Sequence, residues 1–110
     1  MAKKPPVASL DDLGRFSEPA LMILISLADG PKHGYAMTQD IEAVAGLKLG
    51  PGTLYGAIAR LEEREWIEAL PAEDRRRPYK LTTAGHKVLK ARLESLRAVT
   101  MVGHARLAEN

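Results

Sequence analysis

The chain has 110 residues, of which 45% are hydrophobic and 27% are charged, and its net charge is +2. These values are typical of one small globular domain and exclude a disordered chain. The sequence contains no cysteine, which excludes disulfide frameworks and thiol catalysis. Its longest apolar run, Ala20 to Ala28, is far shorter than the ~20 residues of a membrane span, and no signal peptide is recognisable. We therefore expect a soluble, cytoplasmic protein that does not bind membranes.

The polar residues show no arrangement that is suited to catalysis. The three histidines, His33, His86 and His104, are far apart and lack the spacing of metal ligands. No pair of carboxylates, no Ser/His/Asp grouping and no phosphate-binding glycine loop is placed for catalysis. We therefore expect no enzyme, no metal site and no cofactor.

The N-terminal residues allow two readings. We expect residues 1–7 to be disordered. Ser9 is followed three residues later by Asp12, a spacing that can cap a short helix carrying Leu10 and Leu13. An extended arm is the alternative, and the sequence does not decide between the two.

Two helices are expected next. The segment from Pro19 to Ala28 is apolar on nearly every side, which indicates a buried helix. The sequence DGP ends it. From His33 to about Val44, a second helix places Met37, Ile41 and Val44 on one face, which we expect to point inward.

A third helix is predicted from the sequence GPGTLYGAIARLEE. Gly50 is an acceptable N-cap residue, and Pro51 is typical of a first helical position. Leu54, Ile58 and Leu61 repeat at helical spacing and form the expected inward face.

The outer face of this third helix carries Gly56 and Arg60, with Thr53 and Tyr55 beside them. Small residues would let the helix axis come close to a DNA groove, and the free N–H groups of a first turn suit a phosphate. Arg60 can reach a guanine edge or a phosphate. The alternative is that Gly52 and Gly56 only allow neighbouring helices to pack closely.

Two more side chains near this helix are candidate DNA contacts. Tyr35 would point away from Met37 and Ile41, so that its hydroxyl could bond a phosphate. It could equally be a tyrosine packed at a frayed helix start. Lys48, in the turn before the third helix, is either a phosphate contact or a solvated charge.

After the third helix the apolar residues alternate, which predicts a short β-hairpin. Its inward residues are Ile67, Ala69, Tyr79 and Leu81. The loop between the strands carries three consecutive arginines, Arg75, Arg76 and Arg77. Arginines at such a tip are attracted to the negative potential of a minor groove. In the alternative, Glu73 and Asp74 neutralise two of them in a solvated loop; after a helix-turn-helix we favour DNA.

The last predicted helix runs to about Leu107, and Thr82 can cap it through the N–H of Gly85. Apolar residues recur along it at the spacing of a coiled-coil seam, with a second stripe of valines that includes Val88. One face can pack on its own domain and the other on a second copy, which gives a twofold dimer. The alternative is that both faces fold back on the same chain. The candidate dimerisation residues are Leu89, Leu93, Leu96, Val99 and Val102.

This order of elements predicts a mostly α fold with a small β-hairpin, namely a winged helix-turn-helix plus a C-terminal dimerisation helix. We expect an N-terminal arm or short helix over residues 1–17. The DNA-binding domain would cover residues 18–82, and the dimerisation helix residues 83–110.

Three stretches in this order resemble the PadR family of transcriptional regulators: LISLADGPKHGYAMTQDIE, LGPGTLYGAIARLEEREWIE and DRRRPYKLTTAGHKVL. The single C-terminal helix is similar to the family's smaller subgroup. The resemblance implies a homodimeric repressor on a pseudo-palindromic operator in double-stranded DNA. It also implies that a small aromatic or cationic effector releases the DNA.

The resemblance also implies roles for individual residues. Thr53, Tyr55 and Arg60 would lie on the reading helix, Tyr35 would contact the DNA backbone, and the three arginines would form the wing. One position departs from the pattern: Glu65 stands where many members have glycine. A left-handed backbone there would cost roughly 1 kcal/mol in a residue other than glycine.

Two other functions remain open from the sequence. A winged helix can dock on a protein without reading DNA directly. A small-molecule sensor would hold its ligand between subunits, and Trp66 is the large aromatic residue that could stack on it. The position of Trp66 beside the hairpin favours a place in the core instead.

Overall fold

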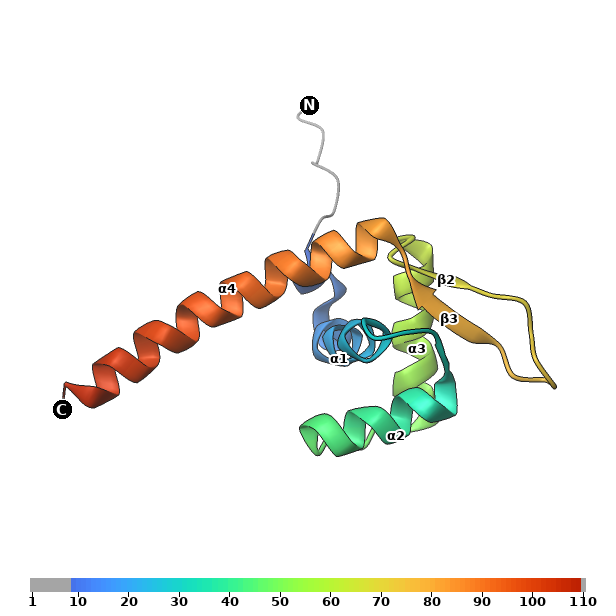
Figure 1. Ribbon diagram of the computed structural model, residues 1–110, viewed down its shortest axis with the longest axis horizontal. Helices are drawn as coiled ribbons and strands as arrows, with labels where there is room; N and C mark the ends of the chain where they lie inside the picture. The colour runs from blue at the N-terminus through green and yellow to red at the C-terminus, as the bar shows by residue number, and fades with distance from the viewer. Residues whose placement is uncertain (1–8, 110) are drawn as a thin grey trace, which may run out of the picture.

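The computed structural model describes residues 9–109, so the expected disorder of residues 1–7 lies outside the described part of the chain. The fold is mostly helical with a small antiparallel sheet, as predicted. Figure 1 shows a body of short helices from which the last helix extends on one side. The elements in chain order are η1 (Leu10–Phe16), α1 (Ser17–Leu27), β1 (Lys32–His33), α2 (Gly34–Ala45), α3 (Pro51–Glu63), β2 (Ile67–Ala69), β3 (Pro78–Leu81) and α4 (Thr83–Ala108).

Within the described part of the N-terminal segment, Leu10–Phe16 form a short helix rather than an extended arm. The Ser9 hydroxyl accepts a hydrogen bond from the Asp11 N–H at 3.1 Å and so caps the first turn of η1. Leu10 and Leu13 are buried, as the helical reading requires. Because these two side chains enter the common core, η1 is fixed against the body of the domain.

The core lies between α1, α2 and α3. The helix α1 is buried over most of its surface, which agrees with its apolar sequence. Met37 and Ile41 of α2 point inward as predicted, but Val44 is 68% exposed, so its predicted inward position is wrong. The chain turns away at left-handed Gly46, and the apolar stripe continues one turn beyond the surface on which α2 packs.

The helix α3 follows its prediction closely. Gly50 is the N-cap residue and has no side chain with which to cap the helix, and Pro51 is the first helical residue. Leu54, Ile58 and Leu61 are buried. This burial fixes which face of α3 is left for contacts outside the domain.

The hairpin belongs to a three-stranded antiparallel sheet in the order β1-β3-β2. Ile67 pairs with Leu81 and Ala69 with Tyr79, which confirms the predicted hairpin. The strand β1 is not predictable from the sequence, because a strand of two residues is too short to show a period of two. This strand places His33 opposite Pro78 and so fixes the start of α2 against the hairpin.

The backbone at the corner between α3 and β2 is left-handed, with φ of 61° at Glu65, a conformation that the sequence had left open. The Glu65 carbonyl accepts a hydrogen bond from the Thr82 hydroxyl at 2.7 Å, which ties the corner to the start of α4. Trp66, the next residue, is 4% exposed and lies in the core, as favoured from the sequence.

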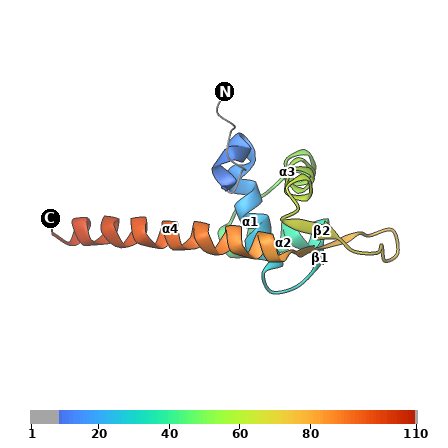
Figure 2. The ribbon, with the colours of Figure 1, turned by 90° about the horizontal axis from the view of Figure 1, so that it is seen from above.

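The helix α4 begins with the predicted cap, in which the Thr82 hydroxyl accepts a hydrogen bond from the Gly85 N–H at 3.0 Å. Leu89 is buried against the body, whereas Leu93 and the apolar residues after it are exposed. Figure 2 shows that α4 and the hairpin loop extend from the body in opposite directions. Within residues 9–109, no helix combines the length and the apolar character that a bilayer span requires.

Candidate nucleic-acid interface

The first turns of α3 are open to solvent. Gly52, Thr53 and Tyr55 are all exposed there. The hairpin flanks this part of the helix on one side and η1 flanks it on the other. Most of the predicted DNA contacts fall into two clusters on these two flanks.

The first cluster, here called the wing pocket, lies where α2, α3 and the hairpin meet. Its volume is about 310 Å³. It brings together five predicted contact residues from three separate segments of the chain. The pocket is lined by His33, Gly34, Tyr35, Tyr55, Arg75, Arg76, Arg77 and Tyr79.

Two tyrosines form the helical side of the wing pocket. A side chain on Gly34 would place its Cβ only 2.5 Å from the Tyr55 hydroxyl oxygen, so this glycine makes room for Tyr55. Tyr35 is 64% exposed, and its hydroxyl accepts a hydrogen bond from the Gln39 amide at 3.3 Å. It therefore points away from the core, as the helical spacing predicted.

The arginine loop is a tight turn. The backbones of Glu73 and Arg76 exchange hydrogen bonds of 2.6 and 2.8 Å, and Arg75 has a φ of 73°. Arg77 donates from Nη1 to the Leu70 carbonyl at 3.2 Å, which holds its side chain along the hairpin. Among the residues that the structure describes, neither Glu73 nor Asp74 forms an ion pair with an arginine of this loop. The positive charge of the loop is thus not cancelled by direct contacts with these two acids.

Tyr79 forms a wall of the wing pocket beneath the loop. Burial raises the pKa of the Tyr79 hydroxyl, and the negative charge of Glu62 raises it further, whereas Arg77 lowers it. The net direction is upward, so Tyr79 stays neutral across the physiological range. It adds no negative charge that would repel an anion in the pocket.

The second cluster, the η1 flank, is built around Phe16. The Arg60 guanidinium carbon lies 3.8 Å from the centroid of the Phe16 ring, and its Nη1 donates to the Gly56 carbonyl at 2.9 Å. A Cβ on Gly56 would lie 2.8 Å from the Phe16 ring. Close packing of a neighbouring helix therefore explains Gly56, whereas the space around Gly52 is open.

Arg15 extends the η1 flank toward solvent. Its guanidinium carbon lies 5.0 Å from the Phe16 ring centroid. Arg15, Phe16, Gly52 and Thr53 line a hollow of about 390 Å³ beside the start of α3. Because Arg60 already donates a hydrogen bond to the Gly56 carbonyl, its side chain is oriented in the free protein.

Lys48 lies in neither cluster. Its ammonium nitrogen is 3.7 Å from a carboxylate oxygen of Glu42, and both side chains are exposed. Such an exposed pair contributes little to stability and can separate when a stronger anion approaches.

Several residues of the two clusters were not named individually as contacts from the sequence, among them Arg15, Phe16, His33, Gly34 and Tyr79. Phe16, His33 and Gly34 take part through contacts with residues far away in sequence, namely Arg60, Arg76 and Tyr55. The sequence signal for His33 was weak because histidine is not among the residues that usually cap helices.

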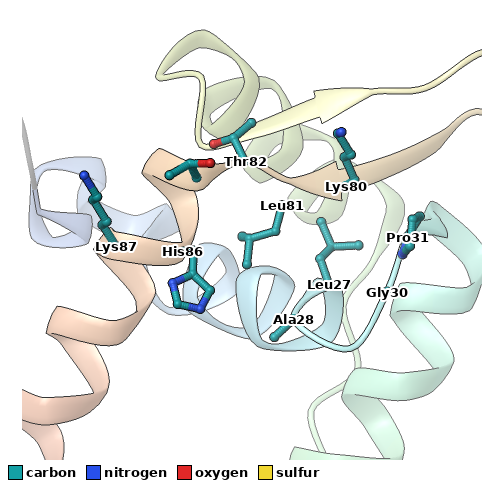
Figure 3. Close-up of a pocket in the computed structure, with 10 residues that line it drawn as sticks. Leu27, Ala28, Gly30, Pro31, Lys80, Leu81, Thr82, His86 and Lys87 are labelled. Carbon is teal, nitrogen blue, oxygen red and sulfur yellow. The ribbon is translucent and has the colours of Figure 1, made fainter.

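A larger pocket lies away from both clusters, between the end of α1 and the start of α4 (Figure 3). It measures about 500 Å³ and contains Leu27 and Leu81. His86 and Lys87 of α4 line another side of it. Lys80 also lines it, but its ammonium pairs with Glu68 at 3.3 Å. The described residues contain no group of three metal-ligating side chains.

The comparisons with known proteins agree with this fold. The sequence model of the transcriptional regulator PadR-like family matches residues 23–91, which is well over half of the chain. An uncharacterised 37.1 kDa protein in transposon Tn4556 of Streptomyces fradiae is 45% identical over 82 residues, 74% of this chain and 24% of that protein. The chain thus spans about a quarter of the length of this curated relative.

Two solved structures are similar to this one. A transcriptional regulator from Clostridium thermocellum shares 29% identity with a TM-score of 0.69, and the match covers 78% of this chain and 86% of that one. A PadR family transcription regulator from hypervirulent Clostridium difficile R20291 shares 22% identity with a TM-score of 0.73, covering 80% and 96%. The second likeness concerns the fold alone. With the family match over residues 23–91, these findings show that the chain belongs to the PadR-like family of transcriptional regulators.

Proposed function

We propose that this regulator is a homodimeric repressor that binds a pseudo-palindromic operator through α3 and the arginine loop. The observation that carries the proposal is the wing pocket, which gathers two tyrosines and three arginines beside the open start of α3. Among the described residues, none of the three arginines forms an ion pair with Glu73 or Asp74, so their charge can attract phosphates, and tyrosine hydroxyls can bond them. Residues 18–82 form the DNA-binding part of this proposal.

Within this proposal each cluster has its own task. Thr53, Tyr55 and Arg60 lie along the reading helix in the major groove, and Arg60 is held ready by Phe16. Arg75, Arg76 and Arg77 contact the adjacent backbone or minor groove, while Tyr35 and Lys48 contact phosphates. Gly56 allows this arrangement indirectly, since its missing side chain admits Phe16.

The part of α4 beyond Arg92 supplies the dimer contact, and the dimerisation helix covers residues 83–110 in the proposed division of the chain. Leu93, Leu96, Val99 and Val102 are 43%, 39%, 67% and 50% exposed in the single chain. Exposed apolar side chains along one helix are unfavourable in water, and burying them against a second copy lowers the free energy. Leu89 is buried in its own domain and marks the inner end of this contact.

The experiment that tests the proposal is a gel-shift titration with DNA from the region upstream of the protein's own gene, repeated at several salt concentrations. We expect affinity to fall steeply with salt, because phosphate contacts release counterions. Weak salt dependence and no protected DNA would instead support the alternative function, a winged-helix module that docks on a protein.

Arg76→Ala sharpens this test. We expect the slope of log affinity against log salt to become shallower by about one unit, since one phosphate contact is lost. Lys90→Ala, which removes an exposed charge from α4, is the matched control and should leave the slope unchanged. An unchanged slope in Arg76→Ala would mean that the Arg76 side chain makes no phosphate contact.

We also propose that a small-molecule effector, which releases the DNA, binds in the pocket shown in Figure 3. Its apolar residues Leu27 and Leu81 suit an aromatic ring, and Lys87 beside them favours an anionic group over a cationic one. The test is a gel shift with and without a benzoate-type acid, comparing the wild type with Lys87→Glu. We expect the acid to weaken DNA binding of the wild type only. Equal responses of the wild type and Lys87→Glu would show that the effector does not bind in this pocket.

A further inference from the structure

His33 faces two hydrogen-bond donors at once. It is the last residue of β1 and the N-cap of α2, where its Nδ1 lies 3.4 Å from the Ala36 N–H nitrogen. Its other ring nitrogen, Nε2, lies 3.3 Å from Nη1 of Arg76 at the hairpin loop. The imidazole therefore bridges the start of the helix and the wing.

The two contacts cannot both be hydrogen bonds. A guanidinium only donates, and a neutral imidazole has one accepting nitrogen and one N–H. The Ala36 N–H is part-buried in the first turn of α2, where losing its acceptor is costly. Arg76 is exposed and can donate to water instead. The helix cap therefore keeps Nδ1 as the acceptor, and Nε2 carries the proton.

In this tautomer, the Nε2–H of His33 and the Nη1–H of Arg76 face each other with no acceptor between them. One anionic oxygen placed between the two groups would accept from both, in a charge-assisted pair of hydrogen bonds. Arg75 and Arg77 line the same pocket and add positive charge around that position.

We propose that His33 and Arg76 form a clamp that holds one backbone phosphate of bound DNA, with His33 donating from Nε2. The proposal rests on the proposed DNA-binding function and adds to it a defined donor atom on His33 and its partner on the wing. In this clamp the phosphate takes the place of the present contact between the two side chains. Binding thereby satisfies donors that oppose one another in the free protein.

The position of the clamp links three elements. His33 starts α2, Arg76 is on the hairpin, and Tyr55 of α3 packs against Gly34 next to His33. A phosphate held here therefore fixes the wing relative to the reading helix. This gives the clamp a role in setting the register of α3 in the groove.

The first test reads the ring proton directly. Long-range proton–nitrogen NMR spectra of the free protein distinguish the two imidazole tautomers, and the exposed His86 and His104 serve as internal references. We expect the proton of His33 on Nε2. A proton on Nδ1 would overturn the proposal, because Nε2 would then already be satisfied by Arg76.

The second test is a double-mutant cycle on affinity for a labelled duplex from the protein's own upstream region. His33→Asn keeps an N-cap residue but loses the ring N–H, and His33→Ser is a second variant of the same kind. We expect His33→Asn to weaken binding roughly tenfold in the wild type. In an Arg76→Ala background it should change affinity less than about twofold, since the clamp is already broken.

The matched control is the same substitution in an Arg75→Ala background, where the full loss should persist. If His33→Asn has the same effect in all three backgrounds, or none in the wild type, the clamp is wrong while the proposed DNA-binding function stands. If the wild type does not bind the duplex at all, both fall together. The cycle thus separates the failure of the clamp from the failure of the function.

Discussion

The two halves of α4 carry similar side chains in opposite surroundings. In the first half, Gly85 and Leu89 are buried against the body of the domain. In the second half, Leu96 and Val99 are exposed, although their residue types would suit a core. Packing on the domain thus accounts for the first half only. The contrast is the physical basis for proposing that a second chain covers the rest.

Glycines provide the sharpest test of this contrast, because each half of α4 contains one. A Cβ on Gly85 would lie 1.9 Å from the Trp66 carbonyl oxygen, whereas a Cβ on Gly103 meets nothing within 4 Å. We expect Gly85→Ala to lower the free energy of unfolding by about 3 kcal/mol, since the backbone must shift. Gly103→Ala should raise it by up to about 1 kcal/mol through helix propensity.

Urea unfolding of both variants at the same chain concentration measures the two changes. A neutral Gly85→Ala would contradict the close packing of the first half. A loss of stability in Gly103→Ala would show that another backbone approaches α4 at this point.

The second prediction concerns the exposed stripe. We expect Leu93→Glu to dissociate the dimer and to weaken operator binding by about 100-fold, since the two half-sites would no longer be bound together. The control is Met101→Glu, which adds the same charge at an exposed position about 80–160° around the helix from Leu93, Leu96, Val99 and Val102. Analytical ultracentrifugation gives the mass, and a gel shift gives the affinity. Equal effects of the two variants would mean that charge, not position, is responsible.

The smallest expected effect lies at the boundary between the halves. Arg92 pairs with Asp11 of η1 at 3.1 Å, which links the helix to the body at that point. Asp11 is largely exposed, so we expect Asp11→Asn to reduce the free energy of unfolding by less than about 1 kcal/mol. Thermal unfolding at low and high salt checks this, and the difference should shrink at high salt. A loss above 2 kcal/mol would make the link a main determinant of the fold.

The sequence predicted those parts of the fold that local signals control. The Thr82 cap and the inward face of α3 depend on neighbouring residues, and the structure confirms both. The sequence left the backbone conformation at Glu65 open, and the structure shows that it is left-handed. Val44 was wrong because helical spacing does not reveal where a packing surface ends. The strand β1 was missed because it is only two residues long.

The candidate site was predicted residue by residue but not as an arrangement. The sequence indicated Tyr55 and Arg76, yet it gave no sign that both lie near His33. The contact of Phe16 with Gly56 also joins residues 40 positions apart in the chain. Such contacts depend on how the helices pack, which periodicity in one segment does not contain. DNA binding and dimerisation by these residues remain predictions.

The central claim is that two copies of this chain, joined through α4, bind one duplex together. Sedimentation equilibrium of the protein with a labelled duplex from its own upstream region measures this directly. We predict two chains per duplex, with contacts on half-sites about 34 Å apart. One wild-type chain per duplex, together with an affinity that Leu93→Glu leaves unchanged, would contradict the claim.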